Sequence, residues 1–201
     1  TAWSLAKLSF QDAPLWQSIS AQSIAPMPEF EPPSLAWTAW SLAKLSFQDA
    51  PLWQSISAQS IAPMPEFEPP SLAWTAWSLA KLGFRDRPLL DALSAASISR
   101  MSDFDHQGLS KMPWSCATLP FADPPLLDSI ASAARPRMFD FDAQARANTA
   151  WACAKLRMPH APLLQSLSPA SIRKIRQFRQ QELTNTAWAY ARLVVCDGPL
   201  M

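Results

Sequence analysis

The sequence predicts an all-α protein, a right-handed α-solenoid built from helix–turn–helix repeats. The octapeptide TAWSLAKL and its variants begin every 37 residues, at Thr1, Thr38, Thr75, Met112, Thr149 and Thr186. Apolar residues make up 49% of the chain, and Trp, Leu, Pro and Phe each recur at a fixed place in the repeat. A fixed period of this size is typical of stacked supersecondary units, none of which can bury its apolar face alone.

We expect a single solenoid over residues 1–201, with repeats 1–37, 38–74, 75–111, 112–148, 149–185 and a partial repeat 186–201. The first two repeats are identical letter for letter. Because the chain starts and stops within a repeat, we expect it to be a fragment of a longer protein.

The first helix of each repeat, called the A-helix, is clearest in EPPSLAWTAWSLAKL, which begins at Glu31. An acidic residue is expected at the N-cap in four repeats, at Glu31, Glu68, Asp105 and Asp142. Helical spacing separates two faces. The predicted inner face comprises Leu35, Ala36, Ala39, Trp40, Leu42 and Ala43. The predicted polar face comprises Pro33, Ser34, Trp37, Ser41 and Lys44.

The second helix, called the B-helix, is predicted over PLWQSISAQSIA, with Pro51 at its first position. Its expected inner residues are Leu52, Trp53, Ile56 and Met64. The linker PMPEF then ends the helix, and its Phe67 is expected to pack between the helices.

The fourth repeat departs most from the pattern, because Gly108 and Pro113 both fall inside its A-helix. An interior Pro removes a backbone hydrogen bond at a cost of about 3 kcal/mol, so we expect a kink or a late start near Pro113. The fifth repeat is regular. A further A-helix follows Phe178, and the chain stops at Met201, just inside the next B-helix.

Charge is nearly balanced overall but unevenly spread. Residues 1–74 hold two lysines against six acidic residues, whereas residues 149–201 hold seven basic residues against two acidic ones. A polyanionic partner would therefore favour the C-terminal end. No apolar run is long enough to span a membrane, so no membrane partner is expected.

No catalytic or metal-binding constellation is visible, and we expect neither an enzyme nor a cofactor or metal. His106 and His160 lie 54 residues apart and are expected in exposed loops. Cys116 and Cys153 occupy one repeat position and are expected to be small core residues. Three unpaired thiols suit a reducing or organellar interior. Neither a nucleophile elbow nor a glycine-rich phosphate loop is present.

The 37-residue motif resembles the octotricopeptide repeats and their relatives, the heptatricopeptide repeats. The match rests on Phe178, Gln181, Leu183, Asn185, Trp188, Ala189, Ala191 and Leu193, and on Phe141, Gln144, Asn148, Trp151 and Leu156. The first two repeats depart from it, with Pro33 and Pro70 in the glutamine column and Trp37 and Trp74 in the asparagine column. The resemblance implies a solenoid that binds single-stranded RNA in mitochondria or chloroplasts.

A reader of single-stranded RNA needs polar or aromatic side chains at a fixed place on each repeat, with cations nearby for phosphate. The candidate RNA-binding residues on the A-helices are Ser34, Trp37, Ser41, Lys44, Ser71, Trp74, Ser78, Lys81, Lys111, Ser115, Asn148, Lys155, Asn185 and Arg192. A basic cluster of Arg173, Lys174, Arg176 and Arg179 completes the set. The alternative interpretation is a solvated face, with Trp37 and Trp74 packed against neighbouring repeats. For the basic cluster the alternative is that it favours a helix C-terminus.

The predicted function is therefore a single-stranded RNA-binding protein in organellar RNA processing, stability or translation, with other proteins as possible partners. The alternative is a protein–protein interaction scaffold of the armadillo or tetratricopeptide type. Near-neutral net charge favours the scaffold, whereas the lysine and asparagine columns favour RNA. The Trp3 column is interpreted as structural, because a residue present in every repeat cannot discriminate between bases.

Overall fold

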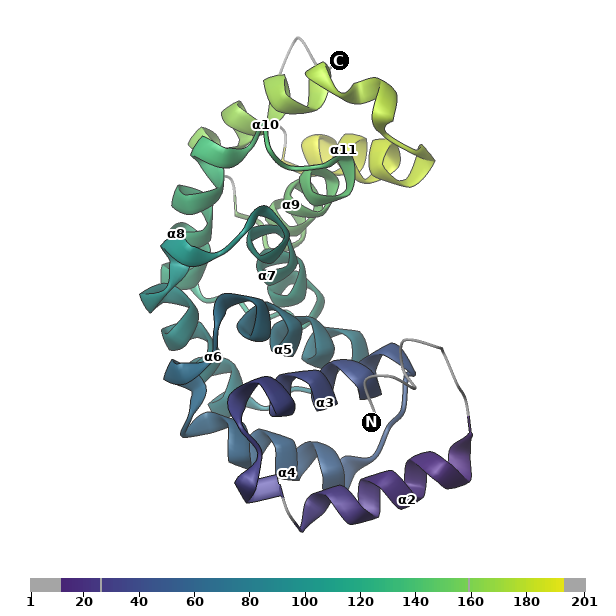
Figure 1. The fold of residues 1–201 in the computed structure, drawn as a ribbon. Helices are drawn as coiled ribbons and strands as arrows, with labels where there is room; N and C mark the ends of the chain where they lie inside the picture. Colours follow the sequence, from purple (N-terminus) through teal and green to yellow (C-terminus); the bar gives the residue numbers. More distant parts are fainter. Residues whose placement is uncertain (1–11, 26, 159, 194–201) are drawn as a thin grey trace. The chain divides into compact units, whose positions relative to one another are not determined.

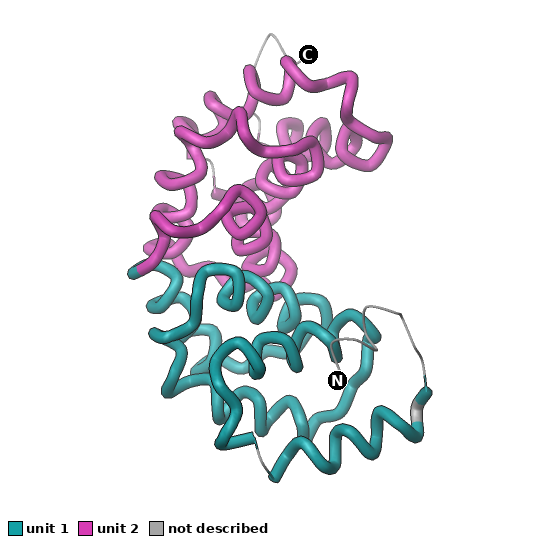
Figure 2. The backbone as a smooth tube through the Cα atoms, in the orientation of Figure 1, with its two compact units in different colours: residues 1–99 teal, residues 100–201 magenta. Residues whose placement is uncertain are grey.

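The computed structural model describes residues 12–25, 27–158 and 160–193, and over these residues all regular structure is helical. The predicted all-α class is thus confirmed. The chain divides into two compact units, Thr1–Ser99 and Arg100–Met201, coloured separately in Figure 2. No helix in the described part of the chain is both long and apolar enough to cross a membrane.

Unit 1 is a two-layer stack of helices. Its elements are α2 (Ala13–Ile24), η1 (Met27–Glu29), α3 (Pro32–Lys44), α4 (Ala50–Ile61), η2 (Met64–Glu66), α5 (Pro69–Leu82) and α6 (Arg87–Ser99). The A-helices α3 and α5 lie side by side in one layer, and the B-helices α2, α4 and α6 follow one another in the second (Figure 1). Stacking of equivalent helices from successive repeats is the packing that defines a solenoid.

Unit 2 repeats this arrangement. Its elements are η3 (Met101–Asp103), α7 (His106–Thr118), α8 (Pro124–Ala134), η4 (Arg135–Arg137), α9 (Ala143–Lys155), α10 (Ala161–Arg173), η5 (Ile175–Gln177) and α11 (Gln180–Leu193). The A-helices α7, α9 and α11 pack side by side, while α8 and α10 form the second layer. Each B-helix is followed by a short 3-10 helix that leads into the next A-helix.

The predicted core positions are largely confirmed. Phe67, Phe104 and Phe141 are fully buried in the linkers, as the Phe column indicated. The B-helix residues Leu52, Trp53, Ile56 and Met64 are buried too, and so are Leu35, Ala36, Ala39, Leu42 and Ala43 of α3. Trp40 is only half-buried, as are Trp77, Trp114 and Trp151 of the same column.

Acidic residues stand at the N-caps of the A-helices, as predicted, but only the aspartates form the capping hydrogen bond. Asp105 accepts from the Gly108 N–H at 2.7 Å, and Asp142 accepts from the Ala145 N–H at 2.7 Å. Glu31 and Glu68 make no side-chain cap. Their carboxylates stand one methylene farther from the backbone, and the two prolines that follow each of them have no N–H to offer.

Four B-helices, α2, α4, α6 and α8, are capped by aspartates that the sequence analysis did not single out. Asp49 accepts from the Leu52 N–H at 2.9 Å, and Asp86 accepts from the Leu89 N–H at 3.1 Å. Asp12 and Asp123 occupy the equivalent N-caps of α2 and α8. Pro51 is then the second helical residue of α4, one place later than predicted.

A serine from the preceding B-helix also contacts this aspartate. The Ser20 hydroxyl donates to Asp49 Oδ2 at 2.7 Å, and the Ser57 hydroxyl donates to Asp86 Oδ2 at 2.7 Å. Each bond therefore joins one repeat to the next. Where the serine column has Ala131, the aspartate column has His160, so both members of the pair are replaced together.

The expected late start of the fourth A-helix is wrong. Helix α7 begins at His106, directly after its Asp105 N-cap, and continues as one element through Pro113. Gly108 fits here because it packs closely against the preceding linker. A Cβ at this position would lie 2.7 Å from Cδ1 of the buried Phe104. The helix B expected to begin near Met201 lies outside the described residues.

Candidate nucleic-acid interface

Four of the described A-helices end in exposed cations, whereas α7 has none in its last turn. Lys44 lies in the last turn of α3 and Lys81 in the last turn of α5, with Lys155 and Arg192 at the same position in α9 and α11. All four side chains are exposed. Each unit thus presents a pair of cations on neighbouring helices. Such cations also favour the helix C-terminus, so their placement stabilises the helices as well.

Two A-helices also carry an exposed tryptophan, and one of these contacts an A-helix cation. Trp37 of α3 is 45% exposed and Trp188 of α11 is 40% exposed, whereas Trp74 of α5 is half-buried. The Arg192 guanidinium carbon lies 5.3 Å from the centre of the Trp188 ring, within range of a cation–π interaction. Exposed aromatic rings of this kind are surfaces on which bases can stack.

The predicted exposure of four serines is wrong. Ser41, Ser71, Ser78 and Ser115 are buried, so they cannot meet a ligand as side chains of an exposed face. The hydroxyls of Ser41, Ser78 and Ser115 donate to the carbonyls of Trp37, Trp74 and Lys111, at 2.7, 2.7 and 2.8 Å. Small residues are needed there because A-helices of successive repeats pack side by side. A serine bonded to the carbonyl four residues earlier satisfies its hydroxyl without a partner helix.

The other polar candidates on the A-helices, Ser34, Asn148, Asn185 and Lys111, are half-buried. Lys111 Nζ donates to Gln107 Oε1 at 3.1 Å. Burial lowers the pKa of Lys111, and the nearby carboxylates of Asp105 and Asp142 oppose that shift. Lys111 is therefore partly desolvated and already engaged, unlike the exposed Lys44 and Lys155.

The basic cluster lies where α10 passes through η5 into α11. Arg173, Arg176 and Arg179 are exposed and Lys174 is half-buried. The Arg173 guanidinium carbon lies 5.2 Å from the centre of the Phe139 ring, which belongs to the preceding linker. The backbone N–H of Arg179 donates to Glu182 Oε2 at 2.6 Å. The structure thus adds an aromatic ring to the predicted cluster.

Two features of this region were missed by sequence reasoning, although both leave a signal in the repeat alignment. Arg146 stands where the other A-helices have Leu35, Leu72, Leu109 and Leu183, and it is only 1% exposed. Phe139 is 46% exposed and lies two residues before Phe141, which occupies the buried Phe column. A departure from a column marks a residue whose surroundings differ from those of the other repeats.

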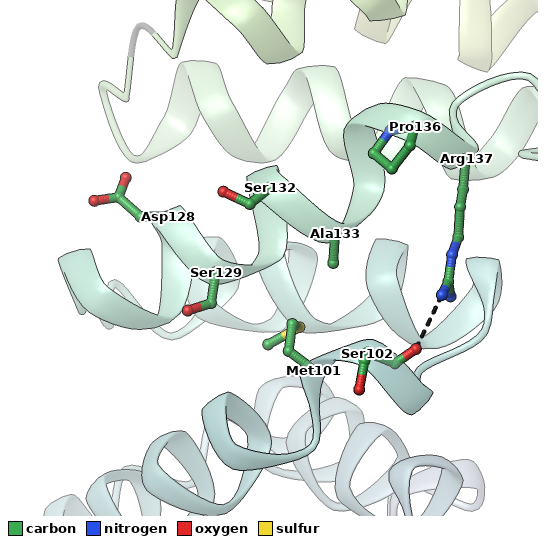
Figure 3. A pocket seen from close by; sticks show the side chains of 8 residues that line it. All are labelled: Met101, Ser102, Asp128, Ser129, Ser132, Ala133, Pro136 and Arg137. Carbon is green, nitrogen blue, oxygen red and sulfur yellow. Dashed lines mark hydrogen bonds between the residues drawn. The ribbon is translucent and has the colours of Figure 1, made fainter.

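An open groove of about 570 Å³ lies between η3 and the α8–η4 segment (Figure 3). Its lining residues are Met101, Ser102, Asp128, Ser129, Ser132, Ala133, Pro136 and Arg137. Arg137 closes one end of it by donating to the Ser102 carbonyl at 2.9 Å. The same guanidinium donates to the Phe104 carbonyl at 2.6 Å, so it fixes η4 to the linker one repeat earlier.

The cysteine and histidine side chains that the structure describes are buried or half-buried. Cys116 and Cys153 are buried, as predicted, and burial raises the pKa of each thiol to about 12. The expectation that His106 and His160 lie in exposed loops is wrong. His160 is the N-cap of α10 and its Nδ1 accepts from the Leu163 N–H at 3.2 Å. His106 opens α7, half-buried, with its ring centre 6.4 Å from that of Phe141.

Comparison with known proteins gives one family. Residues 52–198 match the family model described as RNA-editing substrate-binding complex 6 protein, which covers more than half of the chain. No curated protein matches the sequence. The matched stretch runs from within helix α4 to beyond α11. It includes the basic cluster and three of the A-helix cations, Lys81, Lys155 and Arg192, but not Lys44. The chain therefore belongs to the RNA-editing substrate-binding complex 6 protein family.

Proposed function

We propose that this protein binds single-stranded RNA along its A-helices and works beside other proteins in an assembly that acts on RNA. The main support is the family match over residues 52–198, because the family is named for an RNA-editing substrate-binding complex. Its role is binding and not catalysis. Its site of action is a mitochondrion or chloroplast, a proposal that rests on the resemblance to octotricopeptide repeats, which itself stays a prediction.

The geometry favours phosphate contacts over reading of bases. Lys44, Lys81, Lys155 and Arg192 are exposed at equivalent positions, whereas four of the serines that were expected to read bases are buried. A pair of cations at a repeated position in each unit can hold a flexible phosphate backbone without depending on base sequence. Among the described residues on this face, the exposed Trp37 is left to contact bases, together with four half-buried residues, Ser34, Trp74, Asn148 and Asn185.

Fluorescence anisotropy with labelled single-stranded RNA of random sequence tests the proposal, with duplex DNA as the competitor across a salt series. We expect saturable binding of the RNA, weakened as salt rises because bound phosphates release counterions. Failure to bind RNA at low salt would contradict the proposal and favour a scaffold that contacts only proteins. Equal binding of duplex DNA would reduce the interaction to general attraction for a polyanion.

A further inference from the structure

Phe139 is a large aromatic side chain that the fold leaves open to solvent. It follows η4 in the linker between α8 and α9, and 46% of its surface is exposed. Its neighbour Phe141 takes the buried position of the Phe column, so Phe139 is not needed to fill the core. A single exposed apolar side chain is ordinary on a protein surface, so the case for this ring rests on what holds it and what lies beside it.

The backbone that carries Phe139 is held by a buried arginine. Arg146 Nε donates to the Met138 carbonyl at 3.2 Å, and Arg146 Nη2 donates to the Phe139 carbonyl at 3.0 Å. Desolvation lowers the pKa of Arg146, and the nearby carboxylate of Asp142 opposes that shift. The other repeats place leucine here, so the arginine serves the linker of this repeat in particular.

A second arginine fixes the same linker from the other side. Arg137, the last residue of η4, donates to the carbonyl of Phe104 in the linker one repeat earlier. It also donates to the carbonyl of Ser102 in η3, and Figure 3 shows this second bond. The segment 137–139 is thus anchored by two guanidinium groups to backbone carbonyls. Anchoring of this kind reduces the entropy lost when the exposed ring binds a ligand.

A cation contacts the ring and a second lies on a neighbouring element. The Arg173 guanidinium carbon lies 5.2 Å from its centre, and α10, which ends at Arg173, packs against η4, which begins at the exposed Arg135. Unit 2 as a whole holds twelve basic and eight acidic residues, whereas unit 1 holds five basic and eight acidic ones. Charge therefore favours an anionic ligand at this place in the fold.

We infer that Phe139 and Arg173 form a contact site for single-stranded RNA at the linker edge of unit 2. A base stacks on the open part of the Phe139 ring, and Arg173 and Arg135 bind the flanking phosphates. Arg146 is a positioning residue, because it holds the backbone of the ring and does not reach solvent itself. The inference rests on the proposed function and adds a second group of contacts to the lysines of the A-helices.

Anisotropy titrations of single-stranded RNA with the full chain and its variants test the site. Phe139→Ala should weaken binding by about 5- to 150-fold, the range measured for loss of one stacked base, and Phe139→Trp should restore it. Arg173→Gln should lower the slope of log affinity against log salt by about 0.7, which Phe139→Ala leaves unchanged. Arg146→Met should weaken binding in the wild-type background but not beside Phe139→Ala.

Matched controls come from unit 1. Ile98→Ala removes an exposed apolar side chain, and Arg87→Gln removes an exposed cation that pairs with Asp91. Neither should change the affinity by more than about twofold, because each lies outside the site. Thermal unfolding of every variant checks that the exposed substitutions leave the fold intact.

The outcomes separate the two proposals. RNA binding by the wild type that Phe139→Ala leaves unchanged would overturn this site and leave the proposed function standing. The site is also overturned if Phe139→Ala keeps its affinity for RNA and loses only the binding of a protein partner. Absence of any RNA binding by the wild type would overturn both. Loss of affinity with Ile98→Ala as large as with Phe139→Ala would show a general effect of apolar surface and not a stacking site.

Discussion

The hydroxyl of Ser57 donates to Asp86 Oδ2 at 2.7 Å, while Oδ1 of the same carboxylate accepts from the Leu89 N–H at 3.1 Å. The carboxylate of Asp86 thus caps the N-terminus of α6 and also joins it to α4 of the preceding repeat. The bond lies on the B-helix side, where neighbouring helices make fewer contacts than the A-helices do. It is therefore a specific link between repeats in the less closely packed of the two layers.

Loss of this bond should destabilise the protein. Ser57→Ala should lower the free energy of unfolding by about 1–2 kcal/mol, and Asp86→Ala by more, because the helix cap is lost as well. Urea denaturation of both single variants and the double variant gives their coupling. Gln54→Ala, an exposed change in the same helix, is the control and should have almost no effect. Additive effects of the two single changes would contradict a direct link.

The glycines should respond differently to alanine. Gly108→Ala places a Cβ 2.7 Å from buried Phe104 Cδ1, and should cost about 1–3 kcal/mol by overpacking, despite the better helix propensity of alanine. Gly83 has φ +68° and nothing within 4 Å of an added Cβ, so Gly83→Ala should cost about 1–2 kcal/mol through backbone strain alone. A second change, Phe104→Leu, should reduce the loss of stability caused by Gly108→Ala but not the loss caused by Gly83→Ala. If Phe104→Leu had the same effect on both variants, the close contact with Phe104 would not be the cause.

Removal of the A-helix lysines should make RNA binding less sensitive to salt. The triple change of Lys44, Lys81 and Lys155 to alanine should reduce the slope of log affinity against log salt by about 2, at about 0.7 for each phosphate contact with a single strand. Arg87→Ala, which removes an exposed cation elsewhere in unit 1, is the control. An unchanged slope in the triple variant would exclude these side chains as phosphate contacts.

The buried thiols should link stability to alkaline pH. Burial raises the pKa of Cys116 and Cys153 from an ordinary 9.0 to about 12, so the folded state favours the neutral thiol. Their contribution is fully present below about pH 9 and is lost as pH rises toward 12, by about 1.4 kcal/mol per thiol and pH unit. Urea denaturation between pH 8 and 10 measures this loss.

A variant with both cysteines replaced by alanine should lose less stability over the same pH range. If its pH dependence matched that of the wild type, other groups would be responsible. At pH 8 iodoacetamide should modify neither thiol in the folded protein and both in urea, because the thiolate is the reactive form.

The repeat period was sufficient to predict the helices and most of the core. Columns of Phe, Leu and Trp fix which residues are equivalent, and one amphipathic helix then predicts the others. The serines show where this reasoning fails. Helical spacing places Ser41 opposite the apolar stripe, but an A-helix in a stack has neighbours on its sides as well, so Ser41 is buried although it is polar.

The site was less predictable for a related reason. Equivalent columns report what all repeats share, whereas Phe139 and Arg146 are peculiar to one repeat. The basic cluster was visible in the sequence, but its contact with Phe139 joins residues 34 positions apart in neighbouring linkers. The aspartates that cap the B-helices form a recurring column in the sequence, but only the structure shows that they cap these helices.

Ultraviolet cross-linking of the wild-type protein to single-stranded RNA, followed by mass spectrometry of tryptic peptides, tests RNA binding and its location together. The account predicts cross-links in peptide 138–146, which contains Phe139, and in the identical peptides 8–44 and 45–81, which contain Trp37 and Trp74. Cross-links confined to the B-helices α6 and α8, or none at low salt with saturating RNA, would contradict it.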